Sequence, residues 1–124
     1  MLELGMTEKE ARFIFEKMMN VSIKDEDTKD LWNEVLVASE KYSNIRFQWE
    51  KATFDERLAM DESRSLCHDV LIIKFNQFAR YCKKIGCDYS WRDDLGDEKR
   101  DPENRKRMGD MACWICLFYE LKAR

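Results

Sequence analysis

Residues 111–121 read Met-Ala-Cys-Trp-Ile-Cys-Leu-Phe-Tyr-Glu-Leu and decide the fold of this chain. On a helical projection their apolar side chains occupy every face instead of forming one stripe, so such a helix must be covered all round. The stretch is too short to span a bilayer. We therefore expect it to be the central helix of an all-α domain, with the rest of the chain packed around it.

Three earlier helices are expected from apolar residues at helical spacing. The first begins with a capping-box pattern at Thr7 and ends near Asn20. The second, Leu31 to Ala52, repeats apolar residues every four and three positions. A second capping-box pattern lies at residues 53–56, and the main third helix is expected over residues 61–85. The sequence leaves open whether the second and third helices are continuous or broken near residues 53 and 61.

The connection at residues 87–100 shows no periodicity, and a fourth helix is expected from Pro102 to the C-terminus. Gly109 and Ala112 offer a spot where another helix could approach its backbone closely. Because the other connections are short, we predict a four-helix up-and-down bundle with the apolar C-terminal helix at its centre, as one domain over residues 1–124.

Composition narrows the class of protein. The chain has 124 residues, of which 44% are hydrophobic and 38% charged, with both signs interspersed and a net charge of −3. This composition is typical of a well-solvated helical surface. No signal peptide and no transmembrane run is visible, and five cysteines in such a chain are best explained as reduced thiols. We expect a cytoplasmic protein that does not contact a membrane.

Two patterns could carry chemistry. Cys113 and Cys116 form a CxxC pair, but they lie inside an apolar helix, which favours core packing over a redox or metal site. We therefore expect no metal and no cofactor. His68 is the one histidine, and it could act as a general base with Asp61 or Glu62. We favour a surface role for it, and expect no enzyme and no catalytic residues.

The end of the bundle near residues 87–107 is the predicted binding site. Large or basic side chains gather there, namely Tyr89, Trp91, Arg92, Lys99, Arg100 and Arg105. Aromatic and arginine side chains of this kind are enriched at binding hot spots. Trp91 could equally anchor the end of the core. The basic residues could hold an anion, although local pairing with acidic neighbours and the negative net charge disfavour nucleic acid.

Three functions remain as alternatives. We expect a small cytoplasmic helical protein, of bacterial, phage or mobile-element origin, that acts by binding another protein. The first alternative is a small enzyme that uses His68 with Asp61, Glu62 and Arg64 in a cleft. The second is a homodimer or larger homo-oligomer, since two apolar-rich helices could exceed what one small core covers.

Overall fold

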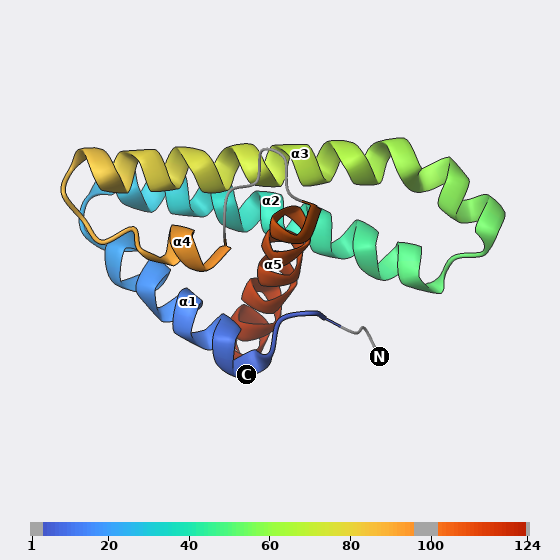
Figure 1. Ribbon diagram of the computed structural model, residues 1–124, viewed down its shortest axis with the longest axis horizontal. Coiled ribbons are helices and arrows are strands. Elements are labelled where there is room, and N and C mark those ends of the chain that lie inside the picture. Colours follow the sequence, from blue (N-terminus) through green and yellow to red (C-terminus); the bar gives the residue numbers. More distant parts are fainter. Residues whose placement is uncertain (1–3, 96–101, 124) are drawn as a thin grey trace.

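The computed structural model contains five helices and no strand among its described residues (Figure 1). It describes the backbone of residues 4–95 and 102–123, and the side chains of residues 4–95 and 105–120. The helices are α1 (Glu8–Ser22), α2 (Glu26–Lys51), α3 (Phe54–Lys84), α4 (Trp91–Leu95) and α5 (Pro102–Ala123). The predicted all-α fold is confirmed.

Short polar side chains set the beginnings of the first three helices. The Thr7 hydroxyl accepts from the Glu10 N–H at 3.2 Å, and the Asp25 carboxylate accepts from the Thr28 N–H at 2.7 Å. At the start of α3, Thr53 and Glu56 form a reciprocal capping box. The chain therefore breaks near residue 53, whereas α3 continues through residue 61 without interruption.

The apolar stretch of α5 lies at the centre, as predicted. Helix α5 contacts each of the other four helices. Its buried side chains from residue 108 onward are Met108, Asp110, Met111, Ala112, Cys113, Ile115 and Phe118. Trp114 is only partly buried, and its indole N–H donates to the Met6 carbonyl at 2.9 Å. The N-terminal segment thus covers part of the surface of α5.

The arrangement of the helices is less regular than a simple bundle. Helices α2 and α3 form a long antiparallel hairpin, and α5 crosses this hairpin steeply in Figure 1. The four-helix up-and-down topology is therefore not confirmed. The predicted loop at residues 87–100 also contains a fifth helix, α4, whose Trp91 and Leu95 are fully buried.

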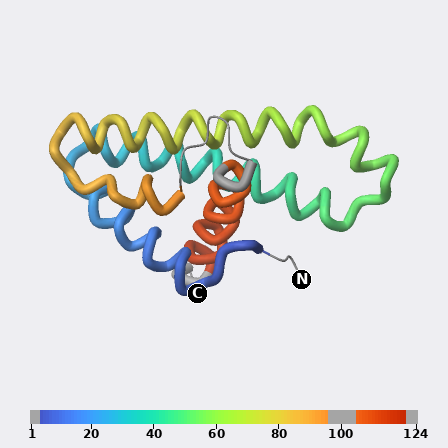
Figure 2. The backbone as a smooth tube through the Cα atoms, viewed as in Figure 1, coloured from blue at the N-terminus to red at the C-terminus, as the bar shows by residue number. Residues whose placement is uncertain are grey.

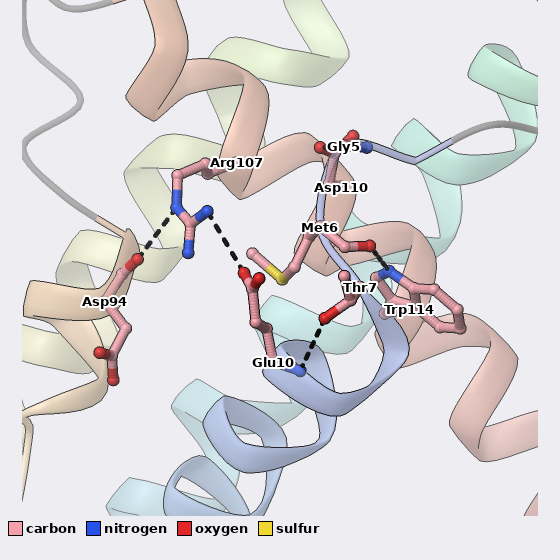
Figure 3. A network of polar contacts seen from close by, with 8 residues as sticks. All are labelled: Gly5, Met6, Thr7, Glu10, Asp94, Arg107, Asp110 and Trp114. Atoms are coloured by element: carbon pink, nitrogen blue, oxygen red, sulfur yellow. Dashed lines mark hydrogen bonds and ion pairs between the residues drawn. The ribbon is translucent and has the colours of Figure 1, made fainter.

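A buried ion pair ties α2 to α5 and to the N-terminal segment. Arg46 Nη1 lies 2.8 Å from Asp110 Oδ1, and these residues are 8% and 1% exposed. The opposite charges of Arg46 and Asp110 attract each other at this distance, but Asp110 Oδ1 accepts no hydrogen bond from a described residue. Asp110 Oδ2 accepts from the Gly5 N–H at 3.0 Å, and Figure 3 shows Gly5 lying over Asp110. This pair was not foreseen from the sequence.

The far end of the α2–α3 hairpin extends beyond the other helices, as the green part of the tube in Figure 2 shows. We call residues 47–70 the distal hairpin and the remainder of the described chain the proximal part. Over the described residues, no helix is long and apolar enough to cross a membrane.

Candidate protein-binding surface

The distal hairpin contains no buried residue, although it spans the end of α2 and the first half of α3. Trp49 of α2 contacts two arginine side chains of α3 there. The guanidinium carbons of Arg57 and Arg64 lie 4.0 and 4.4 Å from the centre of the Trp49 ring. Arg57 also donates to the carbonyls of Trp49 at 2.8 Å and Glu50 at 3.1 Å, which satisfies the C-terminal end of α2.

Exposed apolar side chains concentrate on the outside of α3. Among the described residues, the large apolar side chains that are exposed are Phe13, Ile23, Val37, Phe54, Leu58, Leu66, Val70, Ile73 and Ile85. Five of the nine belong to α3. A cluster of this kind on one element indicates an interaction surface more strongly than scattered single residues do.

Three of these residues form a regular stripe. Leu66, Val70 and Ile73 are spaced by four and then three residues, so they lie on one face of α3. This face points away from the core, which α3 covers with Leu71, Phe75 and Phe78. We call Leu66, Val70 and Ile73 the outer stripe. Val37 of α2 lies beside Val70, and both line a shallow groove of about 320 Å³.

Acidic residues border the outer stripe on one side. Asp55, Glu62 and Asp69 recur every seven residues, so they form a line along α3 next to Leu66 and Ile73. Asp69 Oδ1 pairs with Arg105 Nη2 at 2.7 Å. No described basic side chain pairs with Asp55 or Glu62. We call these three carboxylates the acidic line.

The charge balance of the chain is uneven. The distal hairpin has six acidic and three basic residues, which gives it a net charge of −3. The remaining residues include nineteen acidic and nineteen basic side chains, so they sum to zero. The negative charge of the whole chain therefore resides in the distal hairpin.

The predicted binding residues near α4 are placed differently from one another. Trp91 is fully buried and stacks on Phe78, with ring centroids 5.3 Å apart. This packing favours the core-anchor alternative for Trp91. Tyr89 and Arg92 are partly buried, and Arg92 Nε donates to the Asn76 side chain at 3.1 Å. Partner binding by Tyr89 and Arg92 stays a prediction.

The basic part of the predicted site is only partly described. Lys99 and Arg100 lie outside the described residues. Arg105 is partly buried and turns toward α3, where it contacts His68 and Asp69. The basic residues were expected either to hold an anion or to pair with acidic neighbours. Arg105 pairs with an acidic neighbour, Asp69.

His68 is engaged by Arg105 on both ring nitrogens. Nε2 lies 2.9 Å from the Arg105 carbonyl oxygen, and Nδ1 lies 3.2 Å from Arg105 Nη2. Burial is the main cause that lowers the pKa of His68 below its usual value. Asp61 and Glu62, the expected catalytic partners, are exposed, and Arg64 packs on Trp49. The described contacts therefore do not bring these four residues together as a catalytic group.

The cysteine pair lies where α5 packs against α2. Cys113 is buried and Cys116 is partly buried, and burial raises the pKa of both thiols, that of Cys116 to about 11. A thiol with a raised pKa is a poor nucleophile at neutral pH. Among the described residues, no cluster of three His, Cys, Asp or Glu side chains could hold a metal ion.

No family model, no curated protein and no solved structure matches this chain. The outer stripe was not predicted from the sequence, although Leu66, Val70 and Ile73 have the four-and-three spacing of a helix face. Helix α3 also carries a second periodic face, formed by Leu71, Phe75 and Phe78, and spacing alone does not distinguish the covered face from the exposed one.

Proposed function

We propose that this protein acts by binding another protein through the outer face of the distal hairpin and the adjoining turn of α3. The observation that carries this proposal is the exposed outer stripe: Leu66 and Val70 lie in a segment that has no buried residue of its own, and Ile73 lies in the adjoining turn of α3. Burying such a stripe against a partner removes apolar surface from water, which is the main favourable term in protein association.

The shape of the region also supports the proposal. The far end of the distal hairpin projects beyond α1, α4 and α5 (Figure 1), whereas its base is contacted by Arg105 of α5 at His68 and Asp69. The two-helix projection is stabilised at its tip by Trp49, Arg57 and the capping box at Thr53. A preformed helical surface of this kind binds with little loss of backbone entropy.

The test is site-specific photocrosslinking in the cells that naturally produce the protein. A photoreactive amino acid at Leu66 or Ile73 should give one defined crosslinked protein. The control position is Ile23, which is 78% exposed and lies in the turn between α1 and α2, far from the outer stripe in sequence. Equal crosslinking at Ile23, or none at Leu66 and Ile73, would contradict the proposal.

A further inference from the structure

We infer that the segment docked on this surface is an amphipathic helix with basic residues at seven-residue spacing beside its apolar face. The inference rests on the proposed function and adds the chemistry of the partner. It joins two features of α3: the outer stripe and the acidic line beside it.

The spacing of the outer stripe fits a helical partner. Side chains at positions i, i+4 and i+7 are the pattern by which one helix packs against another at a shallow angle. Val37 widens the stripe toward α2, so that a partner helix would rest on α3 and touch α2 at its edge. An apolar stripe on a helix, bordered by a shallow groove, favours a helix over an extended strand or a loop.

The acidic line sets the charge of that helix. Residues spaced by seven on α3 are about 10.5 Å apart along the axis, so matching cations are needed once every two turns. Asp55 and Glu62 have no basic residue three or four positions downstream on α3. Arg57 and Arg64, which could have neutralised them, are used on Trp49 instead. The uncompensated carboxylates therefore select a basic partner.

The opposite edge of the stripe orients the partner. Lys74 Nζ is already paired with Glu34 Oε1 at 2.8 Å, whereas Lys41 borders the groove beside Val37 and Val70. A partner helix with its basic side toward the acidic line therefore places its other flank next to Lys41. Complementary charges on both flanks favour one orientation of the docked helix over the reverse.

The same charges disfavour other occupants. In an antiparallel pairing of two α3 helices from two copies of this chain, the acidic lines would face each other, and like charges at an interface are repulsive. Nucleic acid is disfavoured because its phosphates would meet carboxylates. A basic helix of another protein satisfies both the apolar and the acidic part of the surface.

The test uses two synthetic helical peptides of three heptads with identical apolar positions. One has Lys and Arg at the flanking positions, and the other has Glu and Gln. Binding of each to the full-length protein is followed by fluorescence anisotropy. The basic peptide should bind at least about tenfold more tightly than the acidic one. Its affinity should fall as ionic strength rises from about 0.05 M to about 0.5 M.

Variants locate the binding on α3. The pair Asp55→Asn and Glu62→Gln should weaken binding of the basic peptide about three- to tenfold, because two exposed charge pairs are lost. Leu66→Ser should weaken binding of both peptides. Glu16→Gln with Glu26→Gln removes the same number of exposed charges in the proximal part and should leave binding unchanged. All variants change exposed residues, and circular dichroism verifies that each remains folded.

Several outcomes would overturn the inference. The inference is wrong if the two peptides bind with equal affinity, if the affinity does not change with ionic strength, or if Leu66→Ser leaves the affinity unchanged. A concentration-dependent increase in mass that Leu66→Glu abolishes would identify a second copy as the occupant. If neither peptide binds while photocrosslinking at Leu66 persists, the inference fails and the proposed function stands. If no crosslink forms at Leu66 or Ile73, both the inference and the proposed function fail.

Discussion

The two ends of the α2–α3 hairpin are built from the same kind of amphipathic helix and have opposite surroundings. At the proximal end, α2 and α3 bury Trp32, Phe75 and Phe78 beneath α1, α4 and α5. In the distal hairpin the two helices have less cover: Arg105 of α5 contacts His68 and Asp69 at the base of the segment, and no residue is buried. The sequence pattern of a helix therefore specifies a face, whereas the neighbouring elements determine whether that face is covered.

Charges follow the same division. In the proximal part, five acidic side chains are paired within the molecule: Glu8 with Arg12, Glu10 with Arg107, Glu34 with Lys74, Asp94 with Lys17, and Asp110 with Arg46. Figure 3 shows how Arg107 joins Glu10 of α1 to Asp94 of α4. In the distal hairpin the described contacts leave Asp55 and Glu62 without a cation. Five of the six ion pairs between described residues thus lie within the proximal part, and the sixth, Asp69 with Arg105, joins the distal hairpin to α5.

The largest expected difference between the two parts is in stability. Trp91→Ala should lower the free energy of unfolding by about 3–5 kcal/mol, because it removes a fully buried aromatic side chain. Leu58→Ala in the distal hairpin should change it by less than about 0.5 kcal/mol, since Leu58 is 61% exposed. Urea denaturation followed by circular dichroism measures both. Similar losses in the two variants would contradict the comparison.

The proximal part was the more predictable of the two. The central helix of residues 111–121 was foreseen because a helix that is apolar all round has one stable environment. Capping-box patterns in the sequence located two helix starts, at Thr7 and Thr53. Helix α4 was not foreseen because five residues are too few to show a helical period. The Arg46–Asp110 pair was not foreseen because its partners are far apart in sequence and nothing local marks them.

The distal hairpin was less predictable for a different reason. Leu66, Val70 and Ile73 have the spacing of a core face, and sequence spacing does not say which of two apolar faces is covered. The predicted binding site lay at the α4 end because its large side chains stood in an irregular segment. Trp91 was equally suited to a core and to an interface, since both use large aromatic residues.

A second prediction tests how tightly the proximal part is packed. A Cβ atom at Gly109 would lie 2.7 Å from the Tyr42 hydroxyl, which is buried between α2 and α5. Gly109→Ala should therefore destabilise the protein by about 1–3 kcal/mol through overpacking, despite the better helix propensity of Ala. Thermal denaturation measures the effect. Tyr42→Phe in the same chain should recover part of the loss, and a stabilised single variant would show that the two helices can separate.

A third prediction concerns local opening of the distal hairpin. Arg57→Ala removes the contact with the Trp49 ring and two hydrogen bonds to the end of α2. Amides near residues 48–60 should then exchange with solvent about fivefold faster, as expected for a loss near 1 kcal/mol in local stability. Amides of α5 should be unaffected. Hydrogen exchange measured by mass spectrometry separates the segments, and faster exchange throughout the chain would contradict independent opening.

The smallest expected effect lies at the junction between the two parts, where His68 meets Arg105. The described contacts fit a neutral imidazole that donates from Nε2 to the Arg105 carbonyl and accepts at Nδ1 from the Arg105 side chain. Protonation would place a second donor against the guanidinium. The pKa of His68 is accordingly lower in the folded state than its ordinary value near 6.5.

The sign of the pH dependence follows from that shift. Between the ordinary pKa and the lower folded pKa, the unfolded chain binds more protons, so stability is retained above about pH 6.5 and falls as the pH decreases below it. The loss should grow as the pH falls toward the lower folded pKa. Urea denaturation at a series of pH values between about 5.5 and 7.5 measures it. Because His68 is the one histidine in the chain, His68→Gln should remove the dependence in this range. If the free energy of unfolding of that variant still depends on pH in this range, another group is responsible for the titration and the prediction for His68 is wrong.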